Sequence, residues 1–182
     1  MVFIYDQPPT DSLRQGEILA GIWEQRQTSL TPTVDDEYSE SLGIEHPWVI
    51  TLSQDCDLAQ DYRFRNENKL DHPSILPHII LCDLNEESEI RGRAEGSDLW
   101  RRIQQNQDER YHHLSAADVA LSTRSLPNLY LDFKKPFTFP LAVLYDAINA
   151  PSVERVALLP APYIHHLVHR FHAFLSRVAL PD

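Results

Sequence analysis

The sequence predicts an α+β domain built on a small, strongly bent antiparallel sheet or barrel that an amphipathic C-terminal helix closes. Several segments of strand length alternate apolar and polar residues or run apolar throughout. Only short helical patterns separate them, and the last twenty residues place apolar side chains at helical spacing. At 182 residues, with 42% hydrophobic content, the chain suits one domain over 1–182. We place its barrel core at about 14–159 and its closing helix at about 162–179.

The N-terminal half contains two predicted strands. The first covers Gly16–Trp23, where apolar residues recur at period two. Those expected on one side of it are Ile18, Ala20 and Ile22. Residues 24–46 are polar and are expected to form a loop. The β-branched run Pro47–Ser53 predicts a strand that is buried on both faces.

The second half alternates short strands with short helices. Further strands are expected over Leu76–Leu84, Arg110–Leu114, Tyr130–Phe133, Phe137–Tyr145 and Val153–Leu159. Pro140 marks an edge or a bulge. Residues 85–96 are expected to form a loop. Ser97 is expected to cap a helix that ends near Gln107, and Ser115 with Asp118 is expected to start a second, brief helix.

The closing helix is expected from about Pro162 to about Ala179. Its apolar face consists of Leu167, Phe171, Phe174 and Val178. Its other side carries His165, His169 and His172 at a spacing that can chelate a metal but is more typical of a solvated face.

The charge distribution restricts the partners. The formal net charge is -11, with 13 basic and 25 acidic residues in 1–150 but 3 basic and 2 acidic in 151–182. An acidic chain disfavours nucleic acid, because binding to phosphates depends on a basic surface. We therefore expect a protein partner, and a homo-oligomer is left open. No signal peptide or membrane-length apolar run is present, which predicts a cytoplasmic protein that does not enter a membrane.

A polar cluster directly follows the second predicted strand. It consists of Gln54, Asp55, Cys56 and Asp57. The negative charges of the flanking carboxylates are expected to disfavour a thiolate at Cys56, which argues against a nucleophile. In the alternative, the carboxylates bind backbone amides of a turn while Cys56 points into the core. As a functional site, this cluster is expected to contact a partner together with Arg110 and His113.

The titratable residues allow two kinds of chemistry, zinc binding and acid–base catalysis. Cys56, Cys82, His112 and His113 are candidate zinc ligands, although no pair has the close spacing of zinc motifs. We expect no cofactor. The acid–base candidates are Asp57, Arg110, His112, His113 and Asp132, which lie on separate segments.

Three segments resemble the MazF/PemK toxin family, whose members are small SH3-like barrels that cleave RNA. They are Arg14–Leu19, which is similar to the opening G-D-I strand, His46–Ser53, which is similar to the R-P-x-x-V-L-S strand, and Leu129–Phe133, which is similar to the late L-D strand. The resemblance implies an SH3-like barrel and a toxin-antitoxin context. His46 replaces the arginine expected before Pro47, which puts RNA cleavage in doubt.

The layout also resembles uncharacterised bacterial proteins that have three short motifs in the same order. These are S-Q-x-C-D-L at Ser53–Leu58, R-Y-x-x-L at Arg110–Leu114 and R-F-x-x-x-x-x-R at Arg170–Arg177. The first hypothesis is a non-enzymatic binding or accessory module that contacts a protein or a small polar partner. The alternatives are a divergent, metal-independent endoribonuclease and a zinc-binding protein.

Overall fold

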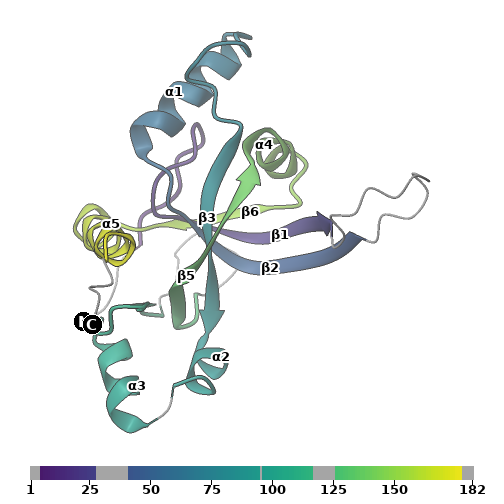
Figure 1. Cartoon of the computed structure of the whole chain (residues 1–182). Coiled ribbons are helices and arrows are strands. Elements are labelled where there is room, and N and C mark those ends of the chain that lie inside the picture. The colour runs from purple at the N-terminus through teal and green to yellow at the C-terminus, as the bar shows by residue number, and fades with distance from the viewer. Residues whose placement is uncertain (1–4, 28–40, 95, 117–125, 178–182) are drawn as a thin grey trace.

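A computed structural model of the chain describes residues 5–27, 41–94, 96–116 and 126–177 and shows an α+β fold. Its antiparallel sheet has the strand order β4-β5-β3-β2-β1-β6 (Figure 1). The strands are β1 (Glu17–Gln27), β2 (Ser41–Thr51), β3 (His78–Glu86), β4 (Tyr111–Leu114), β5 (Leu129–Pro140) and β6 (Glu154–Leu158). The helices are α1 (Asp55–Asn66), α2 (Glu87–Arg91), α3 (Ser97–Gln104), α4 (Leu141–Asn149) and α5 (Ala161–Leu175).

Apolar residues on both faces of the sheet are covered by helices. On one face, α5 buries Leu167 and Phe171 against a cluster that includes Ile50 and Phe133. On the other face, α1 and α4 pack over a second cluster, to which β2 contributes Val49. Within the run Pro47–Ser53, residues 49–52 are therefore buried on both faces, as the β-branched pattern predicted, whereas Pro47 is exposed. A third, smaller cluster joins α2 and α3 to β4 and β5.

The sheet bends strongly at β5. Cys82 of β3 pairs with Pro136, whereas Leu84 pairs with Leu131, so the residues 132–135 bulge out opposite a single residue of β3. The edge strands β4 and β6 are not paired with each other within the described part of the chain, and the sheet is not closed into a barrel. The antiparallel α+β prediction is thus confirmed, and the SH3-like barrel is not.

Most predicted strands are present, but their limits and connections differ from expectation. The expected loop over 24–46 is wrong at both ends, because β1 continues to Gln27 and β2 begins at Ser41. The strand expected to reach Tyr145 ends at Pro140, and α4 begins directly after it. Pro140 has no N–H with which to continue a ladder, but it can precede the first turn of a helix. The helix expected at Ser115 falls on residues outside those described.

Two further differences have local causes. Ile18 and Ala20 share one core cluster, but Ile22 packs in the other, contrary to the alternation that the sequence predicted. Between them Gly21 has a φ of +83°, which interrupts the regular β backbone. The helices α1 and α2 were not predicted, because few of their residues are apolar: the buried residues are Leu58 and Asp61 in α1 and Ile90 in α2.

The closing helix has the predicted apolar face but ends earlier than expected, at Leu175 instead of near Ala179. Leu167 and Phe171 are buried, and Phe174 packs against the same cluster, while Val178 lies outside the described residues. Searched over the described residues, the chain has no helix with the length and apolar character needed to cross a bilayer.

Candidate functional site

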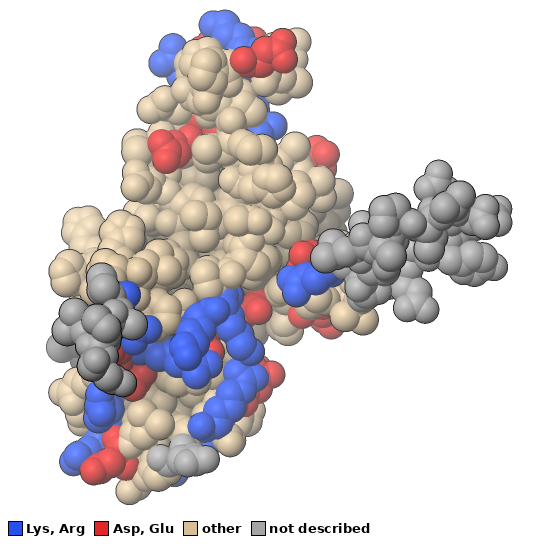
Figure 2. Space-filling model, viewed as in Figure 1, with Lys and Arg blue, Asp and Glu red and all other residues tan. Residues whose placement is uncertain are grey.

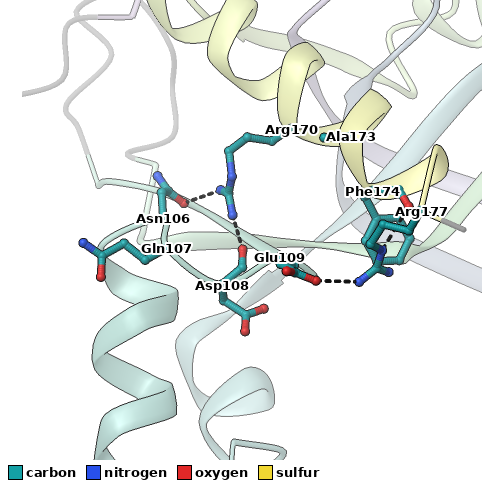
Figure 3. Close-up of a pocket in the computed structure, with 8 residues that line it drawn as sticks. All are labelled: Asn106, Gln107, Asp108, Glu109, Arg170, Ala173, Phe174 and Arg177. Atoms are coloured by element: carbon teal, nitrogen blue, oxygen red, sulfur yellow. Dashed lines mark hydrogen bonds and ion pairs between the residues drawn. The ribbon is translucent and has the colours of Figure 1, made fainter. Parts of the chain in front are cut away.

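The R-Y-x-x-L motif at Arg110–Leu114 and the R-F-x-x-x-x-x-R motif at Arg170–Arg177 meet where α5 crosses the turn between α3 and β4. Arg170 of α5 reaches this turn and binds it through both terminal nitrogens (Figure 3). Its Nη1 donates to Asn106 Oδ1 at 3.1 Å and to His112 Nδ1 at 2.7 Å. Its Nη2 donates to the backbone oxygens of Asp108 and, at 2.9 Å, Tyr111. Arg170 therefore joins segments that are about sixty residues apart in the sequence.

A cavity of about 260 Å³ lies beside this contact. It is lined by Asn106, Gln107, Asp108, Glu109, Arg170, Ala173, Phe174 and Arg177. Arg177 closes one side of it by stacking 3.8 Å over the Phe174 ring and pairing with Glu109 at 3.0 Å (Figure 3). The lining combines charged groups of both signs, so it favours a polar occupant.

His112 is buried against α5 and is not placed for proton transfer. Only 3% of it is exposed, and its Nδ1 accepts a hydrogen bond from Arg170, so the neutral ring carries its proton on Nε2. Burial lowers the pKa of His112 well below the usual value, and the nearby charge of Arg170 lowers it further. The imidazole accordingly stays neutral and holds Arg170 in position.

His113 lies on the opposite face of β4 and is also fully engaged. Its ring stacks on Tyr130 with the centroids 4.7 Å apart, and its Nδ1 lies 3.0 Å from the Gln104 oxygen. Its backbone exchanges hydrogen bonds with the Asn106 amide at 2.6 and 3.0 Å. The two histidines that the sequence placed together therefore point in different directions and have structural contacts.

Arg110 and Asp132 form the charged centre of the neighbouring strand pair. The guanidinium binds both carboxylate oxygens, at 2.7 and 2.5 Å, and lies 4.8 Å above the Tyr111 ring. Asp132 is fully buried and also accepts the Lys134 backbone N–H at 3.1 Å. Burial raises the pKa of Asp132, but the hydrogen bonds from Arg110 and Lys134 outweigh burial and lower it. Asp132 is therefore an anion that anchors Arg110 and shapes the β5 bulge.

The bulge presents a group of cations, which we call the cationic face. It consists of Arg93, Arg110, Lys134 and Lys135. Lys134 and Lys135 are exposed at the bulge. Burial raises the pKa of the Tyr111 phenol, and Arg93 lies close enough to oppose that rise in part. Figure 2 shows Lys and Arg side chains gathered over β5 and around α2. Within the described residues, Arg93 and both lysines form no ion pair, so their charge remains available to a ligand.

The Gln54–Asp57 cluster lies elsewhere, at the start of α1, at the other end of the molecule from α3 and β4 (Figure 1). Asp55 binds the Arg14 guanidinium at 3.0 and 2.8 Å and accepts the Gln15 backbone N–H at 2.6 Å. The Arg14 hydrogen bonds hold the pKa of Asp55 below its usual value. The structure therefore does not bring this cluster to Arg110 and His113, and Asp57 is separated from the other acid–base candidates.

The candidate metal ligands do not converge. Cys56 is exposed on α1, contrary to the expectation that it points into the core, because Leu58 takes the buried position in that turn. Cys82 is buried in β3, where burial raises the pKa of its thiol to about 12. Among the residues that the structure describes, no three His, Cys, Asp or Glu side chains are grouped as a metal site.

A second polar centre, which sequence reasoning largely missed, lies at His46 in β2. This residue is 4% exposed, donates from Nδ1 to Asp83 at 2.6 Å and lies 3.4 Å from Glu24 through Nε2. Its ring stacks on Phe137 with centroids 4.3 Å apart. The hydrogen bond to Asp83 raises the pKa of His46. Its only sequence signal was its position before Pro47, where the resemblance implied an arginine.

Comparisons with protein-family models, with curated proteins and with solved structures found no match to this chain. The function is therefore argued from the geometry of these sites.

Proposed function

We propose that the protein is a binding or accessory module that captures an acidic segment of a protein partner at the cationic face. The observation that carries the proposal is the set of unpaired cations at the β5 bulge of a chain whose net charge is -11. A local cationic surface on an acidic protein attracts acidic segments by charge complementarity.

One cation of the cationic face, Arg110, is held rigidly through its side chain. Asp132 fixes Arg110 with two hydrogen bonds and fixes the bulge through the Lys134 N–H. Arg110 is 36% exposed, so part of its guanidinium remains open to solvent. Rigid cations lose little conformational entropy when a carboxylate binds.

A binding role fits the histidines better than cleavage of RNA does. General acid–base catalysis needs two groups within reach of one substrate bond. His112 is buried and occupied by Arg170, and His113 is held by Gln104 and Tyr130. Of the remaining candidates, Asp57 lies on α1, and Asp132 is paired with Arg110. The endoribonuclease alternative thus has cations for a phosphate but no arranged pair of proton-transfer groups.

We also propose that the sheet is an opened form of the MazF/PemK-like barrel. Its support is that β1 and β5, which are not neighbours in the sheet, line one cavity of about 490 Å³. The three segments with the resemblance fall in the corresponding order, in β1, β2 and β5, and α5 closes the chain.

Binding of a labelled acidic peptide of alternating glutamate and alanine tests the function. The variant Lys134→Glu/Lys135→Glu should weaken binding at least about tenfold, because two attractions of up to ~1 kcal/mol each become repulsions. The matched control Arg63→Glu/Lys69→Glu reverses two exposed cations at the end of α1 and should bind as the wild type does.

Equal binding by both variants would reject the cationic face. Mixed RNA is the second probe. Tighter binding of RNA than of the peptide would replace the protein partner with nucleic acid, and RNA cleavage that is lost in Arg110→Ala/His113→Ala would support the endoribonuclease instead.

A further inference from the structure

The structure contains a fork between two strands that the proposed function does not use. β2 pairs with β3 only over Val49–Thr51, opposite Leu81–Asp83. Beyond this point the strands separate: residues 44–47 of β2 lie in the ladder with β1, and the end of β3 pairs with β5. A cavity of about 240 Å³ occupies the fork, and it is lined by both strands and by α2.

The backbone edges that border the fork have no strand partner among the described residues. Within 44–47, β2 has β1 on one side only, and Leu84–Glu86 of β3 has β5 on one side only. Unpaired edges of this kind accept an additional extended segment, whose main chain supplies the missing hydrogen bonds. Pro47 has no N–H, so it sets the limit of such pairing on β2.

The charges around the fork select the occupant. Glu45, Glu86 and Glu89 line it, are exposed and form no ion pair within the described part of the chain. Asp83, which also lines the cavity, is already matched by His46. A segment entering the fork therefore meets three unmatched carboxylates, which favours lysine or arginine side chains and repels the acidic surface of another copy.

We propose that the fork between β2 and β3 binds an extended, lysine- or arginine-bearing segment of a protein partner by strand addition. The same carboxylates and Pro47 also protect the edge against pairing with identical acidic chains. Protection alone requires no cavity, whereas the fork offers room for side chains between its two edges. The inference is independent of the cationic face and concerns ligands of opposite charge.

The test uses three synthetic peptides with the intact protein. The first alternates lysine and valine over eight residues, the second replaces lysine with glutamate, and the third keeps lysine but carries N-methyl groups on every second amide. The wild type should bind the first peptide and should bind the N-methylated peptide at least about tenfold more weakly, through the lost main-chain hydrogen bonds. The glutamate peptide, which is expected at the cationic face, should not displace the first peptide from the fork.

Charge reversal locates the site. Glu45→Lys/Glu86→Lys/Glu89→Lys should lower the affinity for the lysine peptide at least about tenfold, because three attractions at the fork are lost. The control Glu67→Lys/Asp71→Lys/Asp98→Lys makes the same change in net charge on other exposed positions and should have little effect. Equal binding of the N-methylated peptide, equal weakening by both triple variants, or no binding at all would overturn strand addition at the fork. None of these results affects the acidic-peptide assay at the cationic face.

Discussion

Arg170→Met should loosen the contact between α5 and the turn before β4. The change keeps a long apolar stem over Phe133 but removes four hydrogen bonds. Their acceptors include two backbone oxygens and the His112 ring, which would lose their donor in a largely buried setting. Net values for hydrogen bonds from a charged donor, reduced for partial exposure, give a loss of about 2–4 kcal/mol in the free energy of unfolding. For a chain of this length that is a fall of about 5–12 °C in Tm.

Denaturant unfolding at pH 7.5 measures the loss, and Arg177→Met provides the matched control. Arg177 lies just beyond the end of α5, where it is 43% exposed and its ion-pair partner Glu109 is 74% exposed. Removing this ion pair should lower the free energy of unfolding by less than about 1 kcal/mol. A second readout is the pKa of His112, which should rise in Arg170→Met because a nearby positive charge is gone. If Arg170→Met costs no more than the control and the His112 pKa does not move, Arg170 is not the anchor described above.

Three further predictions concern buried charge, backbone and pH. Asp132→Asn should lower the free energy of unfolding by about 1–3 kcal/mol, because it removes a charged acceptor from Arg110, whose guanidinium is partly open to solvent. The absence of any loss in thermal unfolding would contradict the ion pair. Gly16→Ala should lower the free energy of unfolding by at least about 1–2 kcal/mol, because Gly16 has a φ of +82° and a Cβ there would collide with Ile164. Denaturant titration measures the loss, and an unchanged midpoint would show that α5 can shift. The pKa of His112 is lower in the native state than in the unfolded state, where it is ~6.5. The contribution of the neutral ring to stability is therefore complete above pH ~6.5 and is lost as the pH falls below that value. The loss amounts to up to ~1.4 kcal/mol per pH unit until the native pKa is reached. The difference in stability between wild type and His112→Gln should therefore change between pH 6.5 and 5, and a constant difference would argue against a buried neutral ring.

Sequence periodicity predicted buried faces correctly but missed a helix with few apolar residues. Val49 and Ile50 were predicted to face opposite sides of a buried strand, and Phe171 to face the core, because local periodicity reports which side chains avoid water. The helix α1 was missed because only Leu58 and Asp61 of its residues are buried, so no apolar stripe marks it. Among the site candidates, Arg110 and Asp132 do meet, in one buried ion pair, while Asp57 and Cys56 lie on a helix at the other end of the molecule.

By itself, the sequence determined the α+β class, the positions of most strands and the apolar face of the last helix, since these follow from side chains that are near one another along the chain. Only the tertiary structure decided that Arg170 reaches the turn before His112, that the bulge gathers Lys134 and Lys135 beside Arg110, and that β2 and β3 part to leave a fork. Each of these depends on strand register and on how a long strand bends. Register and bending are set by packing across the whole sheet, and the sequence of one strand does not contain that information.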